Sequence, residues 1–196
     1  MLFEEIADPP AEVDALVKQA REAGLPLPEA MTLATVDAQG RPRARVVLVK
    51  QRLARQFFFF TNYQSDKGRD LSAHPLAELC LHYPSLQLQA RISGSVQRVP
   101  AAHSDAYFAS RPRESQIGAW ASEQSRPLPD RATLEKAFEQ RQAEFAGGSV
   151  PRPQHWGGYA LLSEQVELWR GRPGRLHDRA RFDFENGSWK LQRLYP

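Results

Sequence analysis

Hydrophobic and polar positions alternate with a period of two in many short segments, which is the spacing of strands that bury one face. Residues 31–36 and 43–51 form two such segments, and the polar residues 37–40 between them predict a hairpin turn. Further strands are predicted at residues 56–61, 77–83, 86–99, 158–162, 165–169, 179–184 and 189–194. So many short strands favour an antiparallel sheet over a parallel α/β fold.

Apolar residues with helical spacing interrupt these strands. Residues 11–23 form an amphipathic segment that ends at Gly24, before two prolines that stop a helix. Four more helices are predicted at residues 65–73, 101–110, 115–121 and 131–145. The combined pattern predicts an α+β fold in which peripheral helices surround an antiparallel β-barrel.

The chain is expected to form one domain over residues 1–196. A helical segment at 1–28 precedes the barrel and its helices at 30–196, and the linker-like stretch 146–154 is too short to separate two domains. A length of 196 residues with 41% hydrophobic content is enough to bury a core without disulfides.

The chain is mildly basic. A net charge of +3 and an isoelectric point of about 9.2 suit a protein that binds phosphorylated small molecules or, weakly, nucleic acid. We expect no nucleic-acid partner, because the arginines are dispersed and the sequence shows no basic surface interleaved with aromatic residues.

The single cysteine, Cys80, excludes an intrachain disulfide and a cysteine-based zinc cluster, and no metal is expected. Its apolar neighbours predict a buried, inert thiol.

The first residues of the chain lack the basic start of a signal peptide. No uninterrupted apolar stretch approaches the ~20 residues that a membrane-spanning helix needs. We therefore expect a cytoplasmic protein with no membrane partner.

Candidate phosphate-binding cations occur in three motifs, and the glycine-rich nucleotide loops are absent from the sequence. The first motif runs from Arg43 to Lys50 around an apolar centre that predicts a buried strand. Period-two spacing places Arg45 and Lys50 on opposite faces, so spacing alone does not bring them together. The alternative interpretation is that these charges are solvated strand ends.

The second motif runs from Tyr107 to Ser115. Tyr107 and Arg111 are four residues apart, which predicts that they share one helical face before Pro112 ends the helix. Two hydroxyls and a guanidinium could then converge on one phosphate group. The alternative is a helix end that carries an arginine to satisfy the helix dipole.

The third motif follows Trp169 and combines a glycine- and proline-rich loop with three polar side chains. Arg175, His177 and Arg179 occupy alternate positions, which predicts that they lie on one strand face. The alternative is the polar outer face of an antiparallel sheet.

Together and in this order, these motifs resemble the pyridoxamine 5'-phosphate oxidase family over residues 30–196. Other matching segments lie between them: Phe60-Thr61-Asn62 with Ser65 and Lys67, Gln89, Gln116-Ile-Gly-Ala-Trp120, Gln124-Ser125 and His155-Trp156-Gly-Gly158. Several positions depart from the family pattern: Leu168 replaces the usual aromatic residue before Trp169, Arg170 stands where a neutral polar residue is common, and Leu88 stands where an arginine often precedes Gln89. Asp66 puts a carboxylate where the family usually has a second basic residue near the flavin phosphate.

The resemblance implies an FMN-binding split barrel that forms a homodimer with FMN at the interface. It assigns the FMN phosphate and ribityl region to Arg45, Lys67, Gln124 and Ser125. It assigns the remainder of the flavin site to Val46, Val47, Leu48, Val49, Lys50, Phe60, Thr61, Gln89, Trp169 and Arg179. It assigns binding of the substrate phosphate to Lys50, Tyr107, Arg111 and Ser115. It assigns binding of the pyridine ring to the catalytic pair Arg175 and His177.

The implied reaction oxidises pyridoxamine 5'-phosphate and pyridoxine 5'-phosphate to pyridoxal 5'-phosphate, with O2 as electron acceptor and H2O2 as product. In such a reaction the flavin carries the electrons and the protein aligns the reactants. Two alternatives share the scaffold: a flavin oxidase of phenazine-type substrates, and a non-catalytic protein that binds FMN or pyridoxal phosphate. The intact segment 107–115 favours the B6 substrate, and the presence of Arg175 and His177 favours an enzyme.

Overall fold

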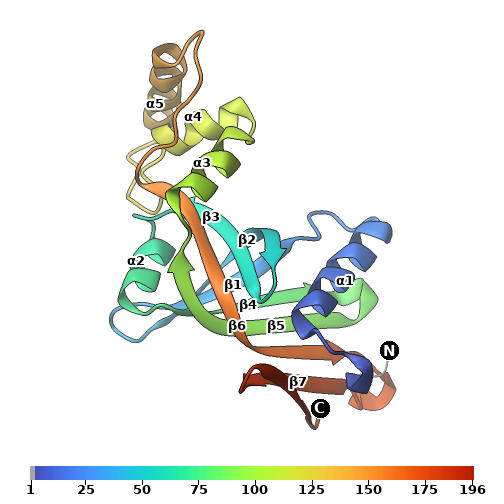
Figure 1. Cartoon of the computed structure of the whole chain (residues 1–196). Helices are drawn as coiled ribbons and strands as arrows, with labels where there is room; N and C mark the ends of the chain where they lie inside the picture. The colour runs from blue at the N-terminus through green and yellow to red at the C-terminus, as the bar shows by residue number, and fades with distance from the viewer. Residues whose placement is uncertain (1–2) are drawn as a thin grey trace.

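A closed antiparallel barrel forms the body of the computed structural model, which describes residues 3–196 (Figure 1). The strands are β1 (Ala30–Val36), β2 (Pro42–Leu53), β3 (Gln56–Asn62), β4 (Leu76–Tyr83), β5 (Leu88–Arg98), β6 (Trp156–Arg170), β7 (Asp178–Glu185) and β8 (Ser188–Arg193). They form one 8-stranded sheet in the order β3-β2-β1-β4-β5-β6-β7-β8. An additional pairing of β3 with β6 closes six of them into a ring, and β7 and β8 extend the sheet beyond it. The predicted α+β fold with an antiparallel split barrel is confirmed.

Helices cover the ends of this barrel. The α-helices are α1 (Pro9–Glu22), α2 (Asp66–Ala73), α3 (Ala101–Ala109), α4 (Arg113–Ala121) and α5 (Arg131–Glu144). Short 3-10 helices occur at Phe3–Glu5, Pro84–Leu86 and Pro173–Arg175. Helices α3, α4 and α5 gather at one end of β3 and β6, whereas α1 lies on the other side near both chain termini (Figure 1). Within residues 3–196, no helix is long and apolar enough to cross a membrane.

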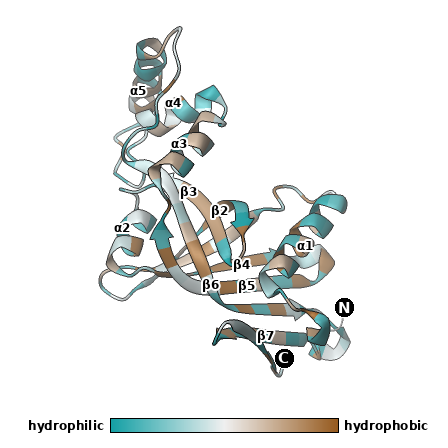
Figure 2. Cartoon of the chain, in the orientation of Figure 1, coloured by the Kyte–Doolittle hydropathy of each residue, from teal (hydrophilic) through white to brown (hydrophobic). Residues whose placement is uncertain are grey.

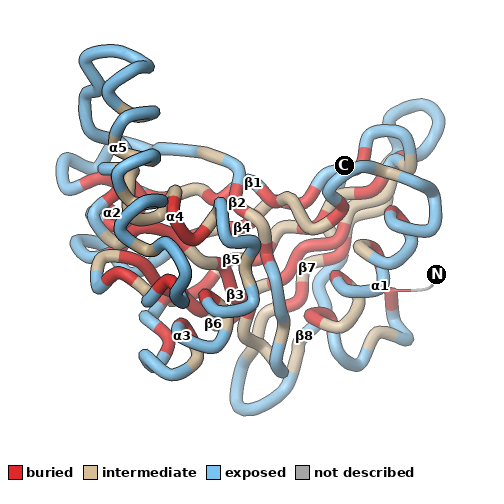
Figure 3. The backbone as a smooth tube through the Cα atoms, turned by 90° about the horizontal axis from the view of Figure 1, so that it is seen from above, coloured by how far each residue is buried: buried red, intermediate tan, exposed pale blue. Residues whose placement is uncertain are grey.

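Alternating side chains of the strands fill the barrel. Hydrophobic residues concentrate along the strands in Figure 2, and the buried segments in Figure 3 follow the same strands, while α5 is exposed along most of its length. Leu33, Leu79, Ile92 and Leu161 are fully buried, each from a different strand. Burial of such side chains, at roughly 25 cal/mol per Å² of apolar surface, is the main stabilising contribution to the barrel.

The predicted elements match the observed ones with a few corrections. Helix α1 starts two residues earlier than predicted, because Asp8 caps it and prolines are accepted in a first turn. The segments 158–162 and 165–169 are one strand, β6, rather than two. The predicted strand at 86–99 begins later, because Gln87 adopts a left-handed backbone conformation (φ 52°) after a 3-10 turn. Residues 1 and 2 of the expected segment 1–28 lie outside the described residues.

The predicted burial of Cys80 is wrong in degree. Its side chain is half-buried, because it lies on the outer face of β4 between Thr32 of β1 and Arg91 of β5. Partial burial raises the pKa of its thiol, with a smaller contribution from the nearby Glu78 carboxylate. The thiol therefore stays protonated at neutral pH, and its inertness remains a prediction.

Two β-bulges bend the barrel strands. One lies in β2, where the register shifts between Val49 and Gln51 and leaves Lys50 as the extra residue. The other lies in β6, where Glu164 is the extra residue opposite Ser93 and Gly94 of β5. A side chain at Gly94 would overlap the carbonyl oxygen of Leu162, so this close approach of two strands requires glycine.

Replacement of Gly94 with alanine is expected to reduce the free energy of unfolding by about 2 kcal/mol or more, because the added methyl group forces β5 and β6 apart. Urea unfolding followed by circular dichroism measures the change. Gly148→Ala is the control, since open space surrounds Gly148 and its backbone is not left-handed. Equal stability of the two variants would show that the bulge can relax without cost.

Candidate functional site

The main cavity of the helix-covered end has a volume of about 650 Å³. We call it the helix-side pocket. Its lining includes these predicted site residues: Val46, Val47, Leu48, Lys50, Phe60, Thr61, Lys67, Tyr107, Arg111, Ser115 and Gln124. It also includes Asn62, Pro112, Gly118, Ala119, Ser122 and Trp156, to which the sequence analysis gave no role. Most of the cofactor and substrate residues predicted from the first two motifs thus share one cavity.

Lys67 is a buried cation on the wall of this pocket, with 8% of its surface exposed. It lies in the first turn of α2, which Ser65 caps. Its ammonium group donates to Thr61 Oγ1 (3.1 Å), Ser65 Oγ (3.2 Å) and Gln124 Oε1 (3.2 Å), all of which are neutral. Burial lowers the pKa of Lys67, and the nearby Arg45 lowers it further. A bound anion would oppose both effects, so the position is suited to binding a phosphate group.

Arg45 lies behind Lys67 rather than in the pocket. Its guanidinium group donates to Asp70 Oδ2 (3.3 Å) and to the buried Thr35 hydroxyl. Thr35 in turn donates to the same carboxylate oxygen at 2.7 Å. Lys50 lines the pocket from the other face of β2, so the predicted opposite orientation of Arg45 and Lys50 is confirmed. The structure therefore gives Arg45 an internal ion pair.

Asp66 faces away from the helix-side pocket. Its carboxylate accepts a hydrogen bond from Arg69 and lies 3.9 Å from Arg43 Nη1. All three residues line a separate surface hollow, and the Asp66 side chain is 42% exposed. Asp66 is thus paired with arginines on the protein surface, although its charge still reaches Lys67 and acts to raise the pKa of that ammonium group.

An aromatic wall closes the opposite side of the pocket. The rings of Phe60 and Tyr107 stack with centroids 3.8 Å apart, and the ring of Trp156 lies nearly parallel to Phe60 at 5.7 Å. The guanidinium carbon of Arg111 lies 4.6 Å from the centroid of Trp156. Such stacking holds the arginine in place without neutralising it.

Arg111 is not on the helix with Tyr107, which corrects the sequence prediction. Helix α3 ends at Ala109, and Arg111 lies in the turn before α4, where Pro112 starts the new helix. Its buried Nη1 has no hydrogen-bond partner among the described residues. Burial lowers the pKa of Arg111, and an anion in the pocket would supply the missing partner.

Gln124 and Ser125 follow α4 and differ in position. Gln124 Oε1 accepts hydrogen bonds from both Thr61 and Lys67, which ties this loop to β3. Ser125 has a left-handed backbone (φ 70°) and is exposed, and it does not belong to the described pocket lining.

The remaining predicted residues lie elsewhere. Gln89, Trp169 and Arg179 are neighbours across β5, β6 and β7. The ring of His177 lies 4.7 Å from that of Trp169, and its Nδ1 accepts the backbone N–H of Arg172 at 3.1 Å. Among residues 3–196, none of these side chains lines the helix-side pocket, and neither does Arg175. We call these five residues the sheet-edge group: Gln89, Trp169, Arg175, His177 and Arg179.

The predicted strand face for Arg175, His177 and Arg179 is wrong. Only Arg179 lies in β7, which begins at Asp178. Arg175 ends a 3-10 turn in which Gly174 (φ 67°) and Arg175 (φ 61°) both adopt left-handed conformations. The glycine and proline of this loop interrupt the alternation that the sequence analysis assumed.

A buried carboxylate, not foreseen from the sequence, orients Arg179. Glu167 of β6 is 6% exposed, and its Oε1 accepts from Arg179 Nε (3.1 Å) and Nη2 (2.9 Å). Its Oε2 accepts from Arg91 Nη1 (3.2 Å), and Arg91 also bonds to both carboxylate oxygens of Glu78. This row of alternating charges crosses four strands. The sequence did contain an indication of this buried carboxylate, because Glu167 stands between apolar residues in the motif Val166-Glu-Leu-Trp169.

Arg111→Met is expected to stabilise the ligand-free protein by about 1 kcal/mol, because it removes a buried donor without a partner and keeps the contact with Trp156. The same variant should bind inorganic phosphate more weakly. Urea unfolding and calorimetric titration with phosphate measure the two effects. Arg113→Met is the control and should destabilise, since Arg113 Nη1 donates to the carbonyl of Gly148 at 2.8 Å.

Glu167→Gln is expected to lower the free energy of unfolding by about 1–2 kcal/mol, because it leaves two partly buried guanidinium groups short of a counter-charge. Thermal unfolding at pH 7 measures this loss. Glu185→Gln, at the exposed end of β7, should have little effect. A Glu167→Gln variant as stable as the control would mean that solvent replaces the carboxylate.

Two family models match this chain. The model described as "Pyridoxamine 5'-phosphate oxidase" matches residues 16–144, and the model described as "Pyridoxine 5'-phosphate oxidase C-terminal dimerisation region" matches residues 156–196. The matched ranges contain all residues of both the helix-side pocket and the sheet-edge group.

Several relatives named pyridoxine/pyridoxamine 5'-phosphate oxidase are similar in sequence. The protein from Caulobacter vibrioides is 54% identical over 169 residues, which span 86% of this chain and 76% of that protein. The protein from Burkholderia lata is 52% identical over 192 residues, which span 96% of this chain and 89% of that protein.

The fold is also similar to solved structures. PhzG from Burkholderia lata, in complex with tetrahydrophenazine-1-carboxylic acid, superposes with a TM-score of 0.93 at 28% identity, covering 100% of this chain and 98% of that one. A pyridoxamine 5'-phosphate oxidase-related, FMN-binding protein from Nostoc punctiforme gives a TM-score of 0.76 at 17% identity, covering 98% and 100% of the two chains, which shows the shared fold. From its sequence matches and its barrel, this chain belongs to the pyridoxamine 5'-phosphate oxidase family.

Proposed function

We propose that this chain is an FMN-dependent oxidase that converts pyridoxamine 5'-phosphate and pyridoxine 5'-phosphate to pyridoxal 5'-phosphate, with O2 as electron acceptor and H2O2 as product. The observation that carries this proposal is the pair of cations in the helix-side pocket. Among the described residues, neither Lys67 nor Arg111 forms an ion pair, and Arg111 lies against the stacked aromatic wall. Two such cations suit two phosphate groups, one from a cofactor and one from a substrate.

The Lys67 side of the pocket fits the FMN phosphate. Lys67 would bind it directly, with Thr61, Gln124 and Ser125 holding the ribityl region. Arg45 would add positive potential from behind. The exposed Val46 and half-buried Leu48 offer an apolar strand face to a flat ring. When bound, FMN supplies two-electron redox chemistry that no side chain can provide.

The Arg111 side of the pocket fits the substrate phosphate. Arg111 would bind it through the donor that lacks a protein partner, and Tyr107 and Ser115 line the same cavity with their hydroxyl groups. Lys50 reaches the cavity from β2. Fixing the phosphate at one end limits how the substrate ring can lie, which is how such residues assist a reaction without taking part in it.

A second copy of the chain would complete the site. The sheet-edge group is separate from the helix-side pocket within one chain, and the relatives' C-terminal region is described as a dimerisation region. We infer a homodimer in which Gln89, Trp169 and Arg179 of one copy border the flavin held by the other. Because His177 Nδ1 accepts a hydrogen bond, its proton lies on Nε2, where it would be donated to the substrate beside Arg175.

Residues 1–196 would act as one domain in this arrangement. Both matched family segments contribute strands to a single continuous sheet, and β6 joins the ring of the barrel to β7 and β8. Separation into two folded parts would break the β5–β6 and β3–β6 pairings.

The proposal is tested with purified protein loaded with FMN. Its visible spectrum reports bound flavin, and addition of pyridoxamine 5'-phosphate should give aldehyde and peroxide in equal amounts. Bound flavin without turnover would indicate a non-catalytic binding protein or another substrate. Failure to bind FMN would refute the proposal.

Lys67→Met is expected to weaken FMN binding by about tenfold or more, because it removes a charge-assisted bond to the phosphate. Quenching of flavin fluorescence measures the dissociation constant. Lys18→Met is the control, since Lys18 is an exposed residue of α1 that pairs with Glu22. Unchanged FMN affinity in the Lys67 variant would place the cofactor phosphate elsewhere.

Oxidation of a phenazine-type substrate is the second candidate function. The close superposition on PhzG in complex with tetrahydrophenazine-1-carboxylic acid favours it. A tricyclic carboxylic acid has no need of a phosphate site, however, and Arg111 with Tyr107 and Ser115 fits a phosphorylated substrate better. Parallel assays with pyridoxine 5'-phosphate and a reduced phenazine carboxylic acid distinguish the two.

A further inference from the structure

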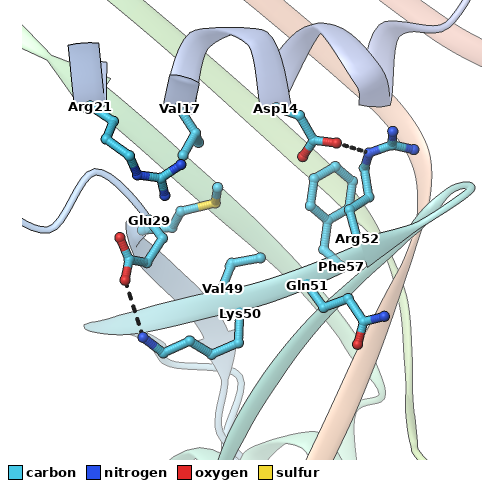
Figure 4. Close-up of a pocket in the computed structure, with 10 residues that line it drawn as sticks. Asp14, Val17, Arg21, Glu29, Val49, Lys50, Gln51, Arg52 and Phe57 are labelled. Atoms are coloured by element: carbon cyan, nitrogen blue, oxygen red, sulfur yellow. Dashed lines mark hydrogen bonds and ion pairs between the residues drawn. The ribbon is translucent and has the colours of Figure 1, made fainter. Parts of the chain in front are cut away.

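Lys50 borders two cavities. It lines the helix-side pocket, and it also lines a second cavity of about 300 Å³ between α1 and β2 (Figure 4). We call the second cavity the α1 pocket; it is also lined by Asp14, Val17, Arg21, Glu29, Met31, Val49, Gln51, Arg52 and Phe57. The β-bulge at Lys50 sets this position between the two cavities.

The Lys50 ammonium group is held on the α1 side. It donates to Glu29 Oε1 at 3.1 Å, and the two side chains point toward one another in Figure 4. Both are only partly exposed, with 30% of the Lys50 side chain and 25% of the Glu29 side chain accessible. Glu29 is fixed to the same strand, because its carbonyl oxygen accepts the backbone N–H of Val49 at 3.0 Å. The carboxylate therefore cannot retreat far from Lys50.

Glu29 carries its negative charge at neutral pH. The pKa of its carboxyl group lies below the usual value, first because its own backbone N–H donates to it and then because Lys50 bonds to it. Arg21 of α1 also contributes to this lowering. A neutral, protonated Glu29 is thus not available to release Lys50 under ordinary conditions.

A phosphate group bound at Lys50 must compete with this carboxylate. If the ammonium group swings into the helix-side pocket on its flexible stem, its bond to Glu29 is lost. If it stays, the carboxylate remains close to the incoming phosphate and repels it. Both cases reduce the affinity for phosphate.

We propose that Glu29 determines how tightly the phosphate site binds, by competing with the substrate phosphate for Lys50. This inference rests on the proposed function, in which Lys50 binds the substrate phosphate. Glu29 is a positioning residue here: it acts on binding through Lys50 and takes no part in electron transfer.

The test compares Glu29→Gln with Asp14→Asn in the FMN-loaded enzyme. Asp14 provides a matched carboxylate, because it lines the same α1 pocket but pairs with Arg52 at 2.6 Å (Figure 4). Glu29→Gln should lower both KM for pyridoxine 5'-phosphate and the inhibition constant of inorganic phosphate by roughly two- to fivefold, the range for a partly exposed ion pair. Its kcat should not change, and Asp14→Asn should match the wild-type protein.

A double variant separates competition from a general structural role. The double variant Lys50→Gln/Glu29→Gln should have nearly the same inhibition constant for phosphate as the single variant Lys50→Gln, because Glu29 then has no ammonium group to compete for. An unchanged or increased KM in the single Glu29→Gln variant would overturn the inference. Calorimetric titration of flavin-free protein with inorganic phosphate tests the same competition without turnover. If the wild-type protein lacks oxidase activity, the proposed function is refuted. The calorimetric comparison of phosphate affinity between the wild-type and Glu29→Gln proteins can still be made, and it tests the competition separately.

Discussion

The pairing of β3 with β6 is the interaction on which the rest of the structure depends. It runs from Gln56 opposite Leu162 to Asn62 opposite Trp156, and it converts an open sheet into a closed ring. Gly157 and Gly158 permit it, because side chains there would overlap Tyr63 and Phe60. Without this pairing, β3 would be an edge strand, and the residues that line the helix-side pocket would have no common frame.

The same pairing positions the chemistry. Thr61 lies near the end of β3, and α2 with Lys67 follows directly after it, while Trp156 begins β6 on the neighbouring strand. The backbone N–H of Tyr63 continues the ladder to the carbonyl oxygen of His155 at 2.7 Å. The end of β3 lies beside the start of β6, so Lys67 and Trp156 line the same cavity. Helix α3 then adds Tyr107, α4 adds Ser115, and the turn between these helices adds Arg111.

This pocket concentrates positive charge at a cost in stability. Neutral oxygens surround the Lys67 ammonium group, and one buried donor of Arg111 has no partner within residues 3–196. Elsewhere three partly buried arginines are paired with carboxylates: Arg45 with Asp70, Arg179 with Glu167 and Arg52 with Asp14. The difference supports the proposal that this pocket binds an anion. The barrel core supplies the stability that offsets this cost.

The sequence by itself determined the strands, the helices and most of the residues of the pocket. Alternation along β1 and β2 and the capped start of α2 are local patterns, and local physics is enough to produce them. The family resemblance, carried by short motifs, singled out Lys67, Tyr107, Arg111 and Gln124, which the structure places around one cavity. Only the tertiary structure decided that Arg111 leaves its helix, that Arg45 is engaged by Asp70, and that Lys50 lies at a bulge beside Glu29. These outcomes depend on contacts between residues distant in the chain, such as Glu29 with Lys50 and Glu167 with Arg179, and no periodicity within one segment encodes which distant partner a side chain will meet.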